Sequence, residues 1–175
     1  MIDNEALKVL RNRRSCKAYK PDQISNEELD TILDAGTWAP TGMGKQSPIM
    51  IAVQDKDDIA ELERINAEIF KKPGAHLFYG APTVVVVLAD AKMPTAVYDG
   101  SLVLGNMLNA ASSIGVGACW IHRAKETFER PDGKALLEKW GITGDYIGVG
   151  NCVLGYAASE PAPALPRKDS YIIKR

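Results

Sequence analysis

Apolar residues recur at helical spacing in three segments before the middle of the chain. The first helix is predicted to begin near Asp3 or Asn4. The second follows the capping-box spacing of Ser25–Glu28 and is predicted to stop at Gly36. The third covers Ile59–Ile69. A loop rich in Gly and Pro should link the second helix to the first strand.

Four other segments have the composition of strands. They are Ile49–Gln54, Thr83–Ala89, Val116–Ile121 and Ile147–Tyr156. Thr83–Ala89 contains four consecutive valines, and its unbroken apolar character predicts a strand buried on both faces.

A helix of about five turns is predicted for Thr95–Ile114. Between Leu102 and Ile114 its few polar residues are Asn106, Asn109, Ser112 and Ser113. Water can cover little of such a helix. It is therefore either the central helix of the domain or a surface that packs against a second chain.

The last residues, 157–175, contain Pro161, Pro163 and Pro166 and lack apolar periodicity. They predict an extended C-terminal arm rather than a folded element. A disordered tail is one interpretation. The other is contact with another surface, because Tyr171–Ile173 places apolar side chains near the end.

Composition narrows the class of protein. A chain of 175 residues predicts one domain, and a net charge of −1 gives no reason to expect nucleic acid or an anionic membrane as partner. The sequence shows no long apolar run and no basic leader, so we expect a cytoplasmic protein. Three cysteines without a CxxC pair and two isolated histidines argue against a disulfide framework and a metal site.

Residues 13–19 place three cations and a hydroxyl within five positions. Arg13, Arg14, Ser15 and Lys17 together could hold a phosphate dianion at several oxygens. The alternative is that these cations offset the negative end of the macrodipole of the first helix.

Four segments, in this order, resemble FMN-dependent nitroreductases. They are residues 13–19, the loop 39–46, the run 115–121 and the tail 165–168. The resemblance extends from Glu5 to Lys168 and is closest to a small, single-domain member. It implies an α+β fold with a mostly antiparallel central sheet flanked by helices, in an intertwined homodimer. It also implies two FMN molecules at the subunit interface.

The same resemblance implies the cofactor-binding residues. Arg13, Arg14 and Ser15 match the phosphate and ribityl site, and Lys17 matches the cation near N1 and O2 of the flavin. The loop that reaches the flavin from the other subunit matches Pro40, Thr41, Gly42, Gly44 and Gln46. The segment beside the flavin ring matches Trp120, Ile121 and His122. The tail that completes the phosphate site matches Arg167 and Lys168.

The implied activity is an FMN-dependent oxidoreductase that uses NAD(P)H to reduce nitroaromatic, quinone or similar small acceptors. Hydride passes through the flavin in a ping-pong reaction, so no side chain is expected to act as a dedicated acid or base. The sequence has no Rossmann glycine motif, and NAD(P)H is expected to bind transiently in the acceptor cleft. Two alternatives stay open: a non-catalytic flavin-binding or storage protein, and a specialised flavin enzyme of the same superfamily.

Some positions depart from the family pattern. Gly44 stands where Asn is usual, and Ser47-Pro48 stands where Pro-Trp is usual. Loss of the Asn amide predicts weaker retention of the flavin. Cys16 and Cys119 lie near the expected flavin and are either redox thiols or small packed hydrophobes.

Overall fold

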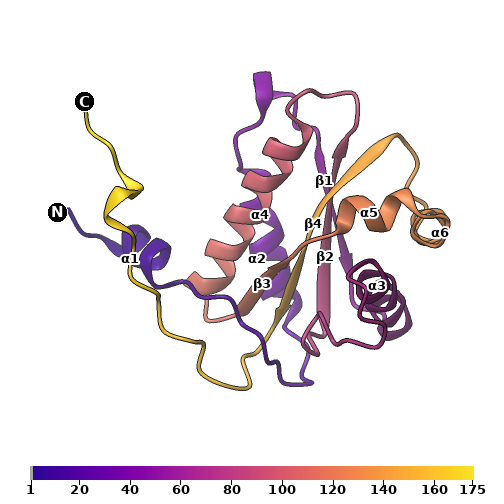
Figure 1. Cartoon of the computed structure of the whole chain (residues 1–175), viewed down its shortest axis with the longest axis horizontal. Coiled ribbons are helices and arrows are strands. Elements are labelled where there is room, and N and C mark those ends of the chain that lie inside the picture. The colour runs from indigo at the N-terminus through magenta and orange to yellow at the C-terminus, as the bar shows by residue number, and fades with distance from the viewer. Residues whose placement is uncertain (1) are drawn as a thin grey trace.

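The computed structural model describes residues 2–175 and contains one antiparallel sheet (Figure 1). Its strands are β1 (Pro48–Val53), β2 (Thr83–Asp90), β3 (Gly117–Ile121) and β4 (Tyr146–Gly155), in the spatial order β1-β2-β4-β3. All four predicted strands are confirmed to within a few residues, and with them the α+β class.

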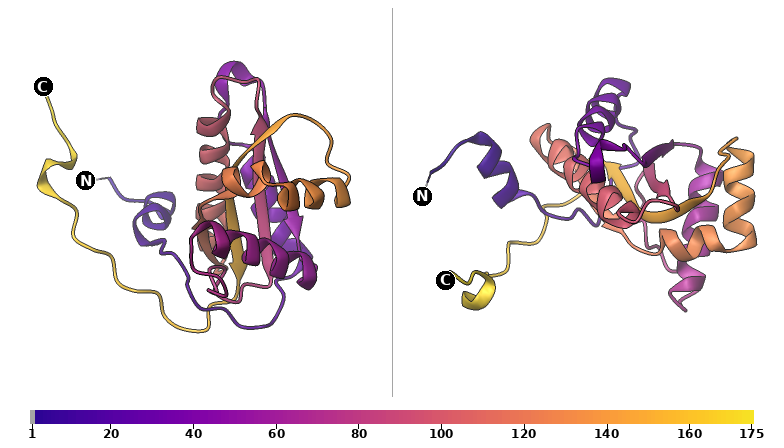
Figure 2. Two further views of the ribbon diagram at one scale, coloured as in Figure 1. Left: turned by 45° about the vertical axis from the view of Figure 1, so that its right-hand side comes forward. Right: turned by 90° about the horizontal axis from the view of Figure 1, so that it is seen from above.

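Helices cover both faces of the sheet (Figures 1 and 2). On one face lie α2 (Asn26–Thr37) and α4 (Ala96–Ser113). On the other lie α3 (Lys56–Ile69), α5 (Ala124–Glu129) and α6 (Pro131–Lys139). The three long helices confirm the predictions, whereas α5 and α6 fall in a stretch for which the apolar pattern predicts no element.

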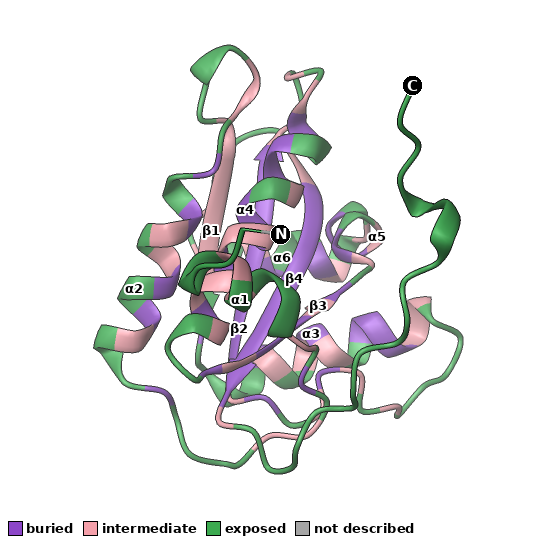
Figure 3. Cartoon of the chain, turned by 90° about the vertical axis from the view of Figure 1, so that its left-hand side faces the viewer, coloured by how far each residue is buried: buried purple, intermediate pink, exposed green. Residues whose placement is uncertain are grey.

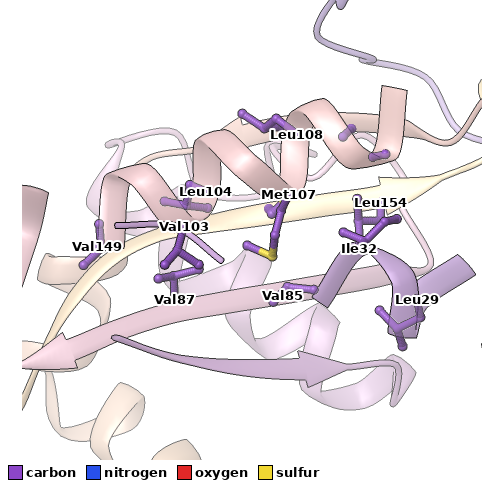
Figure 4. Packing of buried hydrophobic residues seen from close by; sticks show 14 of the residues in the cluster. Leu29, Ile32, Val85, Val87, Val103, Leu104, Met107, Leu108, Val149 and Leu154 are labelled. Atoms are coloured by element: carbon purple, nitrogen blue, oxygen red, sulfur yellow. The ribbon is translucent and has the colours of Figure 1, made fainter. Parts of the chain in front are cut away.

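Strand β2 separates two hydrophobic cores. Val85 and Val87 point into the cluster that α2 and α4 share (Figure 4), whereas Val84, Val86 and Leu88 point into the opposite cluster. All five side chains are completely buried, which confirms the prediction of a strand buried on both faces.

The start of α2 follows the sequence prediction, but its end does not. The capping box is complete: the Glu28 N–H donates to Ser25 Oγ at 3.1 Å, and the Ser25 N–H donates to Glu28 Oε2 at 2.8 Å. Gly36 does not stop the helix, which continues to Thr37. It is needed for close packing, since a Cβ at this position would lie 2.6 Å from the sulfur of Met50.

Two segments stand away from the body of the molecule. Helix α1 (Glu5–Asn12) buries none of its residues and lies beyond the outer side of α4 (Figures 2 and 3). Residues 157–175 run outward as an extended arm with one short 3₁₀ turn, η2 (Asp169–Tyr171), and are exposed throughout. Within residues 2–175, no helix is both long and apolar enough to cross a membrane.

A buried carboxylate joins α3 to the end of α6. Asp58 is 7% exposed and accepts hydrogen bonds from Lys139 Nζ and, at 2.8 Å, from Trp140 Nε1. The bonds from Lys139 and then Trp140 hold the pKa of Asp58 below its ordinary value of 3.8. The folded state therefore binds this proton less readily than the unfolded state does.

We expect Asp58→Ala to lower the free energy of unfolding at pH 7 by about 1–3 kcal/mol, because it leaves the Trp140 donor unpaired. The contribution of the carboxylate is present above pH 3.8 and is lost as the pH falls through the folded-state pKa. Urea denaturation at a series of pH values from pH 7 down to the acid unfolding of the protein measures it, with the exposed neighbour Asp57→Ala as control. Equal losses in the two variants, or a loss that does not depend on pH, would contradict this role.

Candidate functional site

The basic segment after α1 lies along the free edge of β3. Ser15 pairs in parallel with Ala118, and the Cys16 N–H donates to the Ala118 carbonyl at 3.0 Å. Strand β3 is at the end of the sheet, so this pairing covers part of an otherwise open edge. The structure thus brings the predicted phosphate segment, residues 13–17, next to the predicted ring segment, residues 120–122.

The cations of this segment are used differently. Arg14 Nη1 donates to the carbonyls of Arg11 and Arg13, both at 2.8 Å, at the end of α1. This contact supports the helix-end interpretation for Arg14. Within residues 2–175, neither Arg13 nor Lys17 forms an ion pair with a carboxylate, which leaves both available to an anion.

The cysteines near this segment behave as packed side chains. Burial raises the pKa of the Cys119 thiol, and the Ser15 hydroxyl and the charge of Lys17 offset only part of that rise. Cys16 is also buried, and burial raises the pKa of the fully buried Cys152 to about 12. A thiol with a raised pKa is a poorer nucleophile, which favours the packing interpretation of Cys119. For Cys16 the same interpretation is supported by its burial.

The ring segment is divided between the core and the surface. The indole of Trp120 is half-buried above Gly150, where an added Cβ would lie 2.5 Å from Trp120 Nε1. Ile121 is buried and His122 is exposed. The Trp120 side chain therefore packs partly into the core, and the backbone of this segment and the His122 side chain are what remain to face a ligand.

A buried amide that we did not single out from the sequence fixes the end of this segment. Asn66 of α3 is completely buried, and its Nδ2 donates to the His122 carbonyl at 2.9 Å. Its Oδ1 accepts from Arg123 Nε at 3.0 Å. The signal was present in the sequence, because Asn66 is a polar residue on the apolar stripe that runs from Ile59 to Ile69.

The predicted flavin loop lies at the start of α4 and is held there by a second residue that we did not single out. Asp99 is 3% exposed and no cation pairs with it within residues 2–175. Its Oδ1 accepts from the Gly42 N–H at 3.0 Å, and its Oδ2 accepts from Ser47 Oγ at 3.2 Å and Thr95 Oγ1 at 2.9 Å. One carboxylate therefore anchors the loop at Gly42 and the chain just after it at Ser47.

The backbone of the loop explains its glycines. A Cβ at Gly42 would lie 2.3 Å from Thr95 Oγ1, so only glycine fits there. Gly44 closes the 3₁₀ turn η1 (Gly42–Gly44) with φ of +64°. Asn, the usual residue of the family pattern, also tolerates this left-handed region, so the change to Gly preserves the shape of the turn. Pro40 and Gln46 are exposed, and Thr41 Oγ1 accepts from the Gln46 N–H at 3.0 Å.

One chain does not bring the three predicted parts of the site together. The loop lies at the N-terminal end of α4, whereas Ser15 and Ala118 lie just beyond its C-terminal end. A helix of 18 residues is about 27 Å long, so most of the length of α4 separates the two parts. Arg167 and Lys168 are on the exposed arm, where Lys168 Nζ lies 5.4 Å from the centre of the Tyr171 ring.

These features define a small α+β protein with a cation-bearing segment on a sheet edge and an anchored loop at the far end of α4. A family model described as "Nitroreductase family" matches residues 10–156. The chain belongs to the nitroreductase family.

Similar proteins extend over nearly the whole chain. A nitroreductase with bound FMN from Bacteroides fragilis superposes with a TM-score of 0.89 at 31% identity, covering 99% of this chain and 100% of that one. An FMN-bound nitroreductase from Desulfitobacterium hafniense gives the same TM-score at 26% identity and the same coverage. An NAD(P)H-dependent FMN reductase of Bacillus subtilis is 28% identical, covering 94% of this chain and 72% of that protein.

The anchoring role of Asp99 leads to a prediction. Asp99→Ala leaves three donors without an acceptor, so we expect the free energy of unfolding to fall by about 1–3 kcal/mol. The amide of Gly42 should exchange its hydrogen much faster, as followed by mass spectrometry or NMR. Asp99→Asn retains one acceptor oxygen and should have the smaller effect. Unchanged exchange at Gly42 in Asp99→Ala would show that the loop does not depend on this residue.

Proposed function

We propose that the protein is an FMN-dependent oxidoreductase that uses NAD(P)H to reduce nitroaromatic, quinone or similar small acceptors. One observation supports this function above the others. Arg13 and Lys17, which form no ion pair within residues 2–175, lie with Ser15 along the edge of β3, beside the segment that ends at His122. This donor set fits a phosphate dianion joined to a flat, electron-accepting ring.

The chain's own residues would bind and orient the cofactor. Arg13 and Ser15 would hold the phosphate and the ribityl chain, and Lys17 would place a positive charge near N1 and O2 of the ring. The backbone of residues 120–122 would lie beside the ring, and Asn66 would keep that backbone in place through its bond to the His122 carbonyl. Bound FMN would supply the hydride transfer from NAD(P)H to the acceptor.

The second half of the site would come from a partner subunit. The outward face of α4 carries exposed Tyr98 and Leu102, followed along the same stripe by Gly105. A Cβ at Gly105 would meet no atom of its own chain within 4 Å, so packing inside the chain does not require glycine there. A second helix crossing closely at this position would require it.

Antiparallel packing of two α4 helices would place the loop of one chain near the basic segment of the other. Pro40, Thr41 and Gly42 would then reach the partner's flavin, with Gly44 and Gln46 completing the loop. The arm would extend over the partner and bring Arg167 and Lys168 to its phosphate site. On this proposal residues 1–175 form one FMN-binding domain, and residues 157–175 serve the other subunit.

The test is a preparation of the protein saturated with FMN. We expect flavin absorbance bands and, without oxygen or an added acceptor, oxidation of about one NAD(P)H per FMN. Continued oxidation should require a quinone or nitroarene, and the protein should sediment as two chains at low micromolar concentration. Flavin bands without NAD(P)H oxidation would indicate a flavin-binding or storage protein instead. A well-folded monomer that turns over NAD(P)H would refute the shared site.

The arm gives a sharper prediction. Replacing Arg167 and Lys168 by Gln together should weaken FMN binding at least about tenfold, because each charged hydrogen bond contributes about 1.5–3 kcal/mol. Riboflavin lacks the phosphate, so its binding should change much less. Fluorescence titration with both flavins measures the difference, and Lys174→Gln with Arg175→Gln is the matched control on the same arm. Equal losses of affinity for FMN and riboflavin would show that the arm is not part of the phosphate site.

A further inference from the structure

Arg123 has an unusual backbone and a fixed side chain directly after the ring segment. Its φ is +79°, in the left-handed region that non-glycine residues seldom adopt. Its Nε is tied to the buried Asn66, which also binds the His122 carbonyl. The strain of this turn is thus compensated by one amide that holds both the backbone and the guanidinium group.

The guanidinium group shares an aromatic ring with a second cation. Arg123 Cζ lies 4.7 Å from the centre of the Phe70 ring, and Lys72 Nζ lies 5.4 Å from the same centre. Phe70 caps the C-terminal end of α3 and is 43% exposed, so the ring and both cations lie at the surface. We call Arg123, Lys72 and Phe70 the Phe70 patch.

Within residues 2–175, no ion pair neutralises a cation of the Phe70 patch. No carboxylate pairs with Arg123 or Lys72, and the terminal nitrogens of Arg123 make no hydrogen bond in that range. The neighbouring arginines differ: Arg64 binds Glu61, Glu68 and Asp132. Two cations held beside one ring without an anion repel each other, and a bound anion would relieve that repulsion.

We propose that the Phe70 patch binds a phosphate group of the nicotinamide dinucleotide donor. This inference rests on the proposed function, which puts the end of β3 beside the flavin ring that the nicotinamide must reach. The phosphates of the donor are joined to the nicotinamide through ribose and so must lie outside the ring contact. The chain has no Rossmann glycine motif to bind them, and side-chain cations are one group that can. Arg123 offers a fork of free donors and Lys72 a mobile charge.

The kinetic test compares donors with and without phosphate on the FMN-loaded protein, using one quinone acceptor. The donors are NADPH, NADH and the phosphate-free 1-benzyl-1,4-dihydronicotinamide. In Arg123→Gln and in Lys72→Gln we expect the KM for NADPH to rise at least about fivefold, with kcat changed less than about twofold. The KM for the phosphate-free donor should change less than about twofold. Lys125→Gln is the matched control, because it removes an exposed cation that is already paired with Glu129.

The two dinucleotides identify the phosphate. A rise confined to NADPH assigns the Phe70 patch to the 2′-phosphate, and equal rises for NADPH and NADH assign it to the pyrophosphate. Both results support the proposal. Unchanged KM values for both dinucleotides, or an equal rise for the phosphate-free donor, would overturn it. Lower thermal stability with unchanged KM values would likewise overturn it, because the cations would then only offset the C-terminal dipole of α3.

Calorimetric binding of NADP⁺ and NAD⁺ separates this inference from the proposed function. Weaker binding in both variants, with no turnover by the wild type, would support the Phe70 patch and refute the oxidoreductase. Normal turnover with unaltered binding in the variants would refute the patch alone. Failure of the wild type to bind either dinucleotide would also overturn the patch.

Discussion

Burial of β2 on both faces is the constraint on which the rest of the structure depends. Its side chains alternate between two cores, so each face of the sheet needs its own layer of helices. Burying a single valine contributes about 1.5–3 kcal/mol to the free energy of unfolding. Loss of either helix layer would expose several side chains of β2 and remove several such contributions. The layer of α2 and α4 follows from this requirement. Helix α4 satisfies it with one face, and its outward face is left for another role.

The sheet edge couples this fold to the chemistry of the site. Strand β3 ends the sheet, and its open carbonyl at Ala118 accepts the N–H of Cys16. The same bond that covers the edge sets the position of Ser15 and Lys17, because they flank Cys16 in an extended segment. Cations on a flexible terminus would lose much of their binding energy to ordering. Here the backbone pairing has already ordered the segment that carries them, so a structural contact would prepare the proposed anion site.

The elements that could be predicted from the sequence are those with a local signal. The valine run, the long apolar helix and the capping box at Ser25 can each be predicted from residues that are close together in the sequence. Helices α5 and α6 are short, and packing against β4 and α3 rather than a long apolar stripe defines them. The role of Gly36 could not be predicted for a similar reason. A glycine near a helix end predicts a stop, but this glycine is needed for close packing against Met50, which is on β1.

The residues of the candidate site also divide into those with a local sequence signal and those whose role depends on distant segments. Residues 13–17 and the glycines of the loop have patterns that the sequence reveals. The partners of Asp99 and Asn66 have no such pattern, since each residue acts on a segment more than fifty residues away, although the place of Asn66 on an apolar stripe is itself a signal. A lone acid or amide in an amphipathic helix looks like a surface residue until the fold shows it buried. Polar residues on an apolar stripe are therefore the ones to question first when a sequence is read for function.

The length of α4 favours assembly of the site from two subunits. Its two ends lie beside the two halves of the proposed site, and a rigid helix keeps these halves apart within one chain. A two-fold axis across the helix would bring the halves together for both proposed sites at once, because it would set the start of one α4 beside the end of the other. The outward stripe that contains Leu102 and Gly105 would then determine stability and catalysis together. A change that loosens this seam would separate the loop from the flavin even if every residue that touches the cofactor stayed intact.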